Sequence, residues 1–418
     1  MTETEKIFLR ALAAGIHGRG GAAGLCDELW RDGAFDKVMS LAAHHKVLPL
    51  VFDTLCADAE RHTARADDES FSRVRRRALR QVMCQTVQSE EFLALLDKFE
   101  NVALRPLVVK GIVCRQLYPS GDLRPSADED ILVSPSELDA CRAILESEGF
   151  TTCDSAQLFE QTYSRKNGTL RIELHTSLFP PNSTAYGELN RYFADAHAHA
   201  KTVAVGTHTV HTLDCSEHML YLILHAYKHF VHSGFGIRQL CDITLFAERF
   251  DGEIDYAFVA AACRELSADY FAAALFTLCA DCLALEPEVS RRILSHFGGR
   301  VEFDSLLCDI LASGIYGNSE ESRLHSGNMT LDAVESDKSG RSARTRHLRL
   351  SALFPPIERI RERYPYLKRR PYLLFAAYIE RAVSYLKRVS HPLESAEIGS
   401  RRVELLREYK IIDREEQR

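Results

Sequence analysis

Along the chain, the spacing of apolar and polar positions changes twice and divides the sequence into three stretches. Residues 1–105 place apolar side chains at helical spacing, for example over 34–55 and 80–102, with polar positions on the opposite face. Residues 106–215 contain short apolar or alternating runs, and the helical spacing then returns. The pattern predicts an α+β protein in which helical domains at 1–105 and 216–418 flank a mixed α/β core.

The central stretch alternates between strand-like and helical patterns. Its short apolar runs at 106–110 and 128–134 are typical of buried strands. Alternating runs around an Asn-Gly pair at 167–168, and a second alternating stretch at 201–213, indicate β-hairpins. Residues 135–150 predict a helix between the strands, since a proline opens this segment and a glycine ends it. We therefore expect a sheet with a covering helix.

Two stretches of the C-terminal domain carry expectations of their own. Residues 317–346 are polar and poor in large apolar groups, which predicts a mobile loop. Residues 359–388 are basic with interleaved tyrosines, a composition that fits binding to RNA or to an anionic membrane surface. A solvated helix face, whose Arg and Lys stems lie along apolar surface, gives the same pattern and is the explanation that we favour. RNA binding through this stretch would weaken steeply as salt rises.

Composition fits a folded, soluble chain. The 418 residues suggest two or three domains, and the net charge of −7 gives no global reason to expect a nucleic-acid partner. The N-terminus lacks the apolar segment of a secretory signal, and no apolar run approaches the ~20 residues of a membrane span, so we expect a cytoplasmic protein. The twelve cysteines then read as reduced core residues. For Cys279-x-x-Cys282, a metal or redox role is the alternative.

Three consecutive acids, Asp128, Glu129 and Asp130, directly precede a short apolar run. Alternate side chains of a strand share a face, so Asp128 and Asp130 project together and Glu129 points to the other side. Two carboxylates at close range repel each other, and a divalent cation such as Mg²⁺ between them relieves the repulsion. Glu173 completes a three-carboxylate cluster if its strand is a neighbour. An exposed acidic strand end is the alternative.

A helical stretch of the C-terminal domain offers a second group of candidates. His225 and His229 lie four residues apart with Lys228 beside them, so they share one helix face. All three are candidates for lining a ligand-binding cleft. Histidines satisfied at a domain interface are one alternative, and an HxxxH zinc site that lacks the glutamate of the metalloprotease signature is another. Arg238 and Asp242 have the spacing of a structural ion pair within a helix, or of an interdomain latch.

An ordered set of motifs resembles a known family. The motifs are Lys110-Gly111, Leu117-Tyr118-Pro119, Arg124, Asp128-x-Asp130-Ile131-Leu132-Val133 and Glu173-x-His175. In this order they are similar to a bacterial family of uncharacterised nucleotidyltransferases within the DNA polymerase β superfamily. The similarity covers most of the chain and is weakest over 250–345. It implies a nucleotidyltransferase-type mixed β-sheet core with helices for the central stretch.

The resemblance implies roles for the three carboxylates. Asp128 and Asp130 would hold two Mg²⁺ ions, with Mn²⁺ as an alternative metal, and Glu173 would hold the catalytic ion and help to deprotonate an acceptor hydroxyl. The co-substrate would be an NTP such as ATP, from which a nucleoside monophosphate passes to the acceptor with release of pyrophosphate. We expect a small-molecule acceptor first, and a protein or tRNA acceptor, as for toxin-like relatives, second.

The resemblance also implies nucleotide contacts. Gly111 would let the backbone approach the phosphates, and Lys110 or Arg124 would neutralise them. Without that role, Lys110 is a solvated strand end and Arg124 pairs with an acid. The sequence departs from the family pattern at Glu129, where an apolar residue is usual, and at Gly111, which no serine follows.

A catalytically inactive nucleotide-binding or scaffolding protein is the rival function from another class. Such a protein keeps the fold but has no chemical need for three carboxylates. The retention of Asp128, Asp130 and Glu173 together therefore favours an active transferase.

Overall fold

A computed structural model describes the fold. The described residues are 1–18, 25, 29–30, 33–56, 69–152, 159–166, 168–314, 321–339, 357–360, 364, 366–380 and 392–412. The first helices are α1 (Glu3–Ile16), α3 (Ala34–His44), α4 (Leu48–Cys56), α5 (Glu69–Glu100), α6 (Gly111–Arg115) and α7 (Leu138–Ser147). The later helices are α8 (Cys215–His232), α9 (Ile237–Arg249), α10 (Tyr256–Glu265), α11 (Asp269–Leu283), α12 (Pro287–His296), α13 (Asp304–Ser313), α14 (Glu321–Lys338), α16 (Ile357–Ile360), α17 (Tyr366–Arg369) and α19 (Pro392–Glu408). Short 3-10 helices are η3 (Gly121–Leu123), η4 (Gly187–Phe193) and η5 (Pro371–Leu373). The strands are β1 (Leu107–Val108), β2 (Glu129–Leu132), β3 (Thr151–Thr152), β4 (Glu160–Ser164), β5 (Arg171–His175), β6 (Lys201–Val205) and β7 (His208–Thr212).

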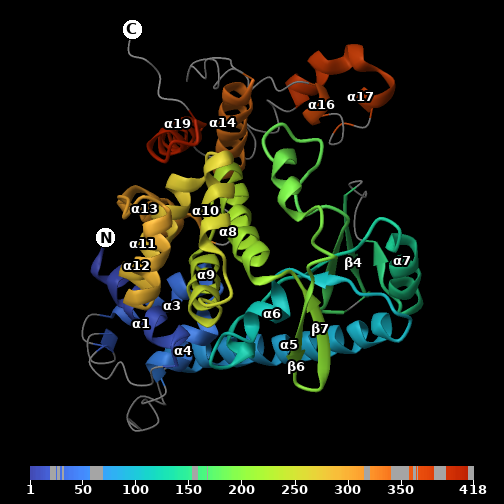
Figure 1. The fold of residues 1–418 in the computed structure, drawn as a ribbon. Helices are drawn as coiled ribbons and strands as arrows, with labels where there is room; N and C mark the ends of the chain where they lie inside the picture. The colour runs from blue at the N-terminus through green and yellow to red at the C-terminus, as the bar shows by residue number, and fades with distance from the viewer. Residues whose placement is uncertain are drawn as a thin grey trace.

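One mixed sheet organises the central region, with its strands in the order β3-β4-β5-β2-β1-β7-β6 (Figure 1). β2 runs parallel to β5 and β1 runs parallel to β7, while the other neighbouring strands are antiparallel. The two expected hairpins are present as β4–β5 and β6–β7, although Asn167 of the first turn lies outside the described residues. The chain is therefore an α+β protein, as its sequence predicts.

Helices α5 and α7 cover one face of the sheet, and α5 runs beneath the strands in Figure 1. Phe92, Leu96 and Phe99 of α5 recur at helical spacing and share a buried core with Ile131 of β2. Since successive residues of a strand point to opposite faces, burial of Ile131 on this side directs Asp130 to the other face of the sheet. The apolar run after the acids thus orients them.

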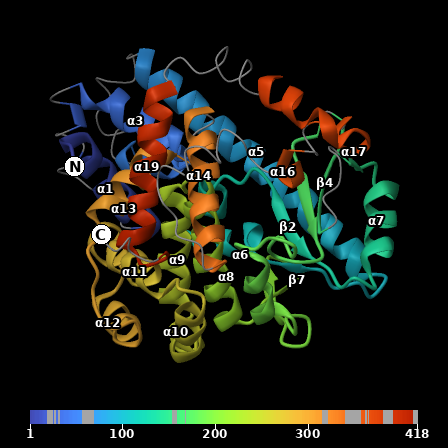
Figure 2. The same ribbon diagram turned by 90° about the horizontal axis from the view of Figure 1, so that it is seen from above.

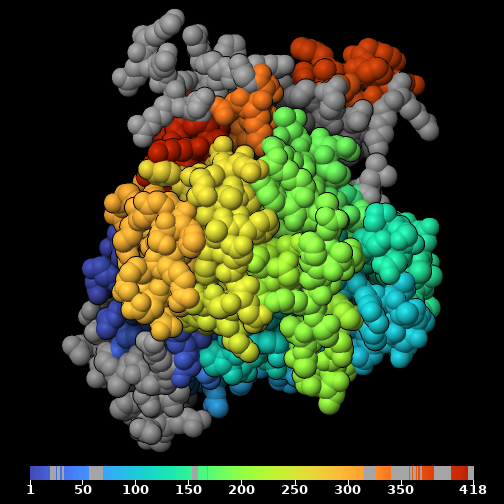
Figure 3. All heavy atoms as spheres, viewed as in Figure 1, coloured from blue at the N-terminus to red at the C-terminus, as the bar shows by residue number. Residues whose placement is uncertain are grey.

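A second, larger core joins helices that are far apart in sequence. Phe8 and Leu12 of α1 belong to the same buried cluster as Phe271 of α11. His17 Nε2 lies 2.9 Å from the carbonyl oxygen of Leu283, and Figure 3 shows the blue N-terminal helices packed beside the orange ones of the second half. The two ends of the chain, expected as separate helical domains, share this core. The division of the chain into three domains stays a prediction.

The prediction of a mobile loop at 317–346 is wrong for the described part of that stretch, because this part forms helix α14. Met329, Ala333 and Val334 are buried there, and α14 packs against α8 and α19. Figure 2 shows α14 and α19 side by side. Gly399 of α19 lies against Met329, so the two helices approach closely. Burial of a few apolar side chains between helices outweighs the polar composition on which the expectation rested.

Other sequence expectations meet the structure in part. Where residues 359–388 are described, Ile360, Tyr364 and Leu367 contribute to a small buried core, and RNA or membrane binding by this stretch stays a prediction. Cys279 is fully buried in α11, which fits core packing. None of the described helices combines the length and the apolar character needed to cross a bilayer.

Candidate active site

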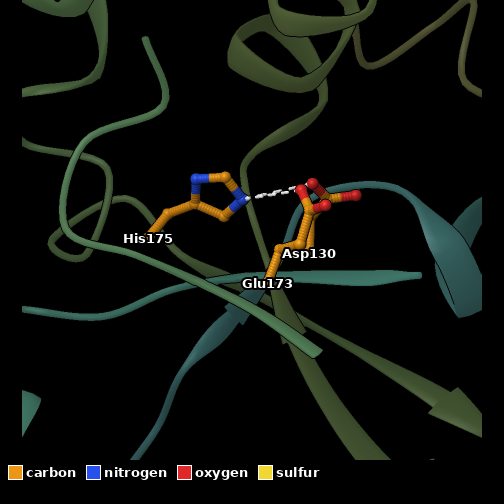
Figure 4. Close-up of side chains that lie close together, drawn as sticks. All are labelled: Asp130, Glu173 and His175. Atoms are coloured by element: carbon orange, nitrogen blue, oxygen red, sulfur yellow. Dashed lines mark hydrogen bonds and ion pairs between the residues drawn. The ribbon is translucent and has the colours of Figure 1, made fainter. Parts of the chain in front are cut away.

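The parallel pairing of β2 and β5 brings two acids together. Asp130 and Glu173 are directly opposite each other in the register, and His175 follows two residues later on the same face of β5. His175 Nε2 lies 3.2 Å from Asp130 Oδ1 and 3.6 Å from Glu173 Oε2. Figure 4 shows the imidazole pointing toward both carboxylates. The neighbouring strands that the three-carboxylate hypothesis requires are therefore present.

A single pocket gathers the residues that the sequence singles out. It lies between the sheet and helices α8 and α9 and has a volume of about 230 Å³. All nine candidates line it: Lys110, Gly111, Arg124, Asp128, Asp130, Glu173, His225, Lys228 and His229. Their roles as metal or nucleotide ligands stay predictions, but their convergence from distant segments is a structural fact.

The two aspartates of the pocket differ in their electrostatic surroundings. Burial, and then the neighbouring Asp130 carboxylate, raise the pKa of Asp128 to about 7. Burial acts in the same direction on Asp130, but the Lys110 ammonium and His175 outweigh it and hold the pKa of Asp130 well below its usual range. Asp130 is thus a stable anion, whereas Asp128 lacks a comparable partner.

His175 carries the complementary positive charge. Burial lowers its pKa, yet hydrogen bonds to Asp130 and Glu173 outweigh burial and raise the pKa to about 9. Its Nδ1 lies 3.8 Å from Glu160 Oε2, on the adjacent strand β4. Near neutral pH, the pocket therefore holds an imidazolium among three carboxylates.

Lys110 begins a line of polar contacts into α8. It precedes α6, and its Nζ lies 2.9 Å from Asp130 Oδ2 and 3.1 Å from His225 Nε2. His229 Nε2 in turn lies 3.2 Å from His225 Nε2. Burial lowers the pKa of both histidines, and the charge of Lys110 lowers them further. A neutral His225 therefore accepts a hydrogen bond from the ammonium. Lys110 is therefore half-buried and ion-paired, and it is not a solvated strand end.

Arg124 pairs with an acid rather than standing free. Its Nε and Nη2 donate to the two carboxylate oxygens of Asp242 at 2.7 and 2.6 Å, and Tyr118 donates its hydroxyl to the same acid. The expected pair of Arg238 with Asp242 is wrong, because Arg238 donates instead to the carbonyl oxygen of Pro125. Nη1 of Arg124 is buried without a hydrogen-bond partner among the described residues. Arg124 is also one of the residues that line the pocket.

Buried contacts account for Glu129, where the sequence departs from the family pattern. It is buried on the far side of β2, where Arg115 Nη2 donates to its Oε1 at 2.5 Å. The backbone N–H of Ile112 donates to Oε2 at 3.0 Å. Gly111 has a φ of 37°, and a Cβ there would overlap Glu129 Oε2. The positive φ and the contact with Glu129 both require glycine at 111 in this chain, whether or not a phosphate approaches the backbone there.

Further residues outside the sequence-based candidate set also line the pocket, and three of them are neighbours of the candidate carboxylates and histidines: His175, Glu160 and Tyr221. His175 belongs to the motif Glu173-x-His175. Its spacing of two residues from Glu173 is the sequence signal that places both side chains on the same face of a strand. Glu160 pairs with His175 in the β4–β5 register, and Tyr221 precedes His225 by one helical turn. The sequence predicts the β4–β5 hairpin but not the register that sets Glu160 opposite His175. As for zinc, neither of the metal-capable groups found in the described part of the chain contains His225 or His229.

Comparison with known proteins gives one match. Residues 32–284 fit the model of a family described as uncharacterised nucleotidyltransferase. This region contains all the pocket residues named above. No curated protein matches the chain, and no solved structure does.

Proposed function

Since this chain belongs to the family of uncharacterised nucleotidyltransferases, we propose that it transfers a nucleoside monophosphate from an NTP to an acceptor hydroxyl. The motifs also place it, in our proposal, in a bacterial branch of the DNA polymerase β superfamily, with residues 106–215 as the catalytic core. One observation carries this function. Three carboxylates, Asp128, Asp130 and Glu173, line a single pocket on the face of the sheet where the parallel strands β2 and β5 are neighbours.

The donor set of the pocket fits a hard divalent cation. Oxygen atoms of Asp128, Asp130 and Glu173 are the ligands that Mg²⁺ prefers, and Mn²⁺ accepts the same set. The raised pKa of Asp128 reflects burial and repulsion from Asp130, which a bound cation would relieve. Bound Mg²⁺ would neutralise phosphate charge and acidify the acceptor hydroxyl.

The remaining groups of the pocket would handle the nucleotide. Lys110 and His175 neutralise Asp130 and Glu173 in the structure. With a cation bound to these carboxylates, Lys110 would be available to contact a phosphate oxygen and His175 would give up its extra proton. Glu173, whose side chain is 26% exposed, remains accessible to an acceptor hydroxyl and would accept its proton. Catalysis would rest mainly on positioning and charge neutralisation.

The acceptor in this proposal is a small molecule. A polyanion such as tRNA needs several available cations for its phosphates. In the pocket, Arg124 is bound to Asp242 and Arg238 to a backbone carbonyl group, which leaves Lys110 and Lys228 for the phosphates of the NTP. With its two remaining cations assigned to the NTP, the pocket favours a compact hydroxyl compound over tRNA as the acceptor. Cytoplasmic location, in line with the sequence, is part of the same proposal.

The decisive experiment titrates the protein calorimetrically with ATP, GTP, CTP and UTP, each with and without Mg²⁺. We expect at least one nucleotide to bind only with the metal. Replacement of Asp128 and Asp130 by Asn should abolish this binding, whereas Asp139→Asn, which changes an exposed carboxylate of α7, should leave it unchanged. Unaltered Mg²⁺-dependent binding in the double variant would refute the assignment.

A metal-independent nucleotide-binding protein is the second candidate. The observation in its favour is that Lys110 and His175 already satisfy the acids without a metal. Nucleotide binding that is equally strong with Mg²⁺ and with EDTA would select this function.

A further inference from the structure

A second pocket lies near the start of α8, and the residues that line it include none of those around the first. Four acids and one histidine face it: Asp195, His199, Asp214, Glu217 and Asp255. Glu217 precedes His225 by eight residues, which corresponds to about 12 Å along the helix. The proposed transferase chemistry uses none of these side chains.

Three of them converge on one point. One ligand atom from each of His199, Asp214 and Glu217 lies within 4.8 Å of the other two. Asp214 is the N-cap of α8, and its Oδ1 accepts hydrogen bonds from the backbone N–H groups of Ser216 and Glu217 at 2.7 and 3.3 Å. This cap fixes the Asp214 side chain and leaves Oδ2 for another partner. His199 enters from the segment just before β6.

Glu217 supplies the independent sign of a ligand. The residue is only 6% exposed, and its Oε1 lies 3.0 Å from His199 Nδ1. Its Oε2 is buried and has no hydrogen-bond partner among the described residues. An anionic oxygen removed from water without a partner is unfavourable. A cation in the cluster would satisfy it.

The charge around the pocket supports a cation. The acids outnumber the available positive groups, because Arg191, which also lines the pocket, donates to Glu265 at 2.5 Å. His199 is the remaining basic side chain of the lining. Negative charge from several carboxylates attracts a divalent ion from solution.

We propose that His199, Asp214 and Glu217 bind a divalent transition-metal ion of the Zn²⁺ class. One imidazole nitrogen and two carboxylate oxygens form a donor set that Zn²⁺ accepts, with water completing the coordination. Mg²⁺ favours oxygen ligands and retains its water, so the imidazole discriminates against it. The bound ion would tie the segment before β6 to the first turn of α8. This site is independent of the proposed transferase activity.

Equilibrium dialysis of the full-length protein against Zn²⁺, followed by metal analysis, tests the site. His199→Gln changes a side chain that is 57% exposed, so folding should be unaffected. We expect this variant to bind one Zn²⁺ fewer than the wild-type protein, and Glu217→Gln to show the same loss. His197→Gln is the matched control, since His197 lies two positions away and outside the cluster.

The Asp130→Asn variant separates this site from the pocket of the proposed active site. We expect it to keep the Zn²⁺ ion that His199→Gln loses, and we expect Zn²⁺ to raise the Tm of Asp130→Asn but not of the double variant Asp130→Asn/His199→Gln, in which both metal-capable groups of the described residues are changed. Unchanged Zn²⁺ stoichiometry in His199→Gln would overturn the proposal. So would an equal Zn²⁺ stoichiometry in Asp130→Asn and in the double variant Asp130→Asn/His199→Gln.

Discussion

Lys110 and Asp130 form an ion pair inside the candidate active site, with 2.9 Å between Nζ and Oδ2. Both side chains are largely buried, at 17% and 5% exposure. Asp130 is also the carboxylate that the proposed chemistry assigns to a metal ion. The lysine of the protein and an external cation therefore compete for the same oxygen atoms, and the competition can be measured.

Replacing Lys110 by Met should have opposite effects on two ligands. Without the ammonium, Asp130 is free for a metal, so Mg²⁺ affinity in the absence of nucleotide should rise about tenfold, or about 1.4 kcal/mol. Affinity for Mg²⁺-ATP should instead fall by about the same factor, because a phosphate contact is lost. Calorimetry measures both. Lys37→Met, at an exposed lysine of α3, is the control, and a fall in both affinities would contradict the competition.

Replacing each aspartate separately by Asn should change stability in different directions. Asp130→Asn leaves Lys110 and His175 without their shared anion, and breaking a buried pair of this kind costs about 3 kcal/mol or more. Asp128→Asn removes an unfavourable buried charge and should leave the free energy of unfolding unchanged or raised. Urea unfolding in EDTA measures both values. If both variants lost the same free energy of unfolding, the proposed difference between the surroundings of Asp128 and Asp130 would be refuted.

Arg124 and Asp242 should behave as a unit. Arg124→Leu and Asp242→Leu each strand a buried charge, so each should destabilise the protein by about 3–5 kcal/mol, while the double variant should lose much less than the sum. A double-mutant cycle by chemical denaturation provides the coupling energy. Additive losses would mean that the two groups act independently. Arg124→Lys keeps the charge but not the bidentate contact, so it should destabilise the protein less than Arg124→Leu does.

Acidification should destabilise the chain through His45. Burial, and then the neighbouring His44, lower the pKa of His45 from 6.5 to about 3. Between these values the unfolded chain binds a proton that the folded chain does not. The contribution of neutral His45 to the free energy of unfolding is therefore complete above pH 6.5 and is lost as the pH falls toward 3. The loss amounts to a few kcal/mol, at about 1.4 kcal/mol per pKa unit.

The variant His45→Asn isolates this effect. Its free energy of unfolding, measured by urea denaturation at several pH values between 7 and 4, should fall less steeply with acid than that of wild type. His44→Asn, at the partly exposed neighbour, should keep most of the wild-type slope. If the free energy of unfolding of His45→Asn fell with pH as steeply as that of wild type, His45 would not be the source of the acid sensitivity.

The sequence was enough to predict which side chains face the pocket where the two-residue repeat of a strand determines their direction. The alternation of Asp128, Glu129 and Asp130 ahead of an apolar run predicts which acids face the pocket, and the apolar Ile131 is indeed buried on the opposite side. The neighbouring position of Glu173 was stated as a condition, and the β2–β5 register fulfils it. These inferences need only the two-residue repeat of a strand.

Pairings across long sequence separations could not be predicted. Asp242 has two arginine candidates, one at helical spacing and one 118 residues away, and the distant Arg124 forms the pair. The local rule fails because the backbone carbonyl of Pro125 offers Arg238 another acceptor. The same limit applies to α14, whose stability comes from burial against α8 and α19 rather than from its own composition.

The buried contact of Arg115 with Glu129 also restricts the routes by which this sequence can change over generations. Gly111 has no room for a side chain while Glu129 is present, and Arg115 has no partner once Glu129 is gone. Loss of the acid alone would strand a buried guanidinium, and any side chain at 111 would first require loss of the acid. Glu129 and Arg115 are therefore expected to vary together among relatives. Chains with an apolar residue in place of Glu129 should also lack the arginine, which a comparison of sequences can test.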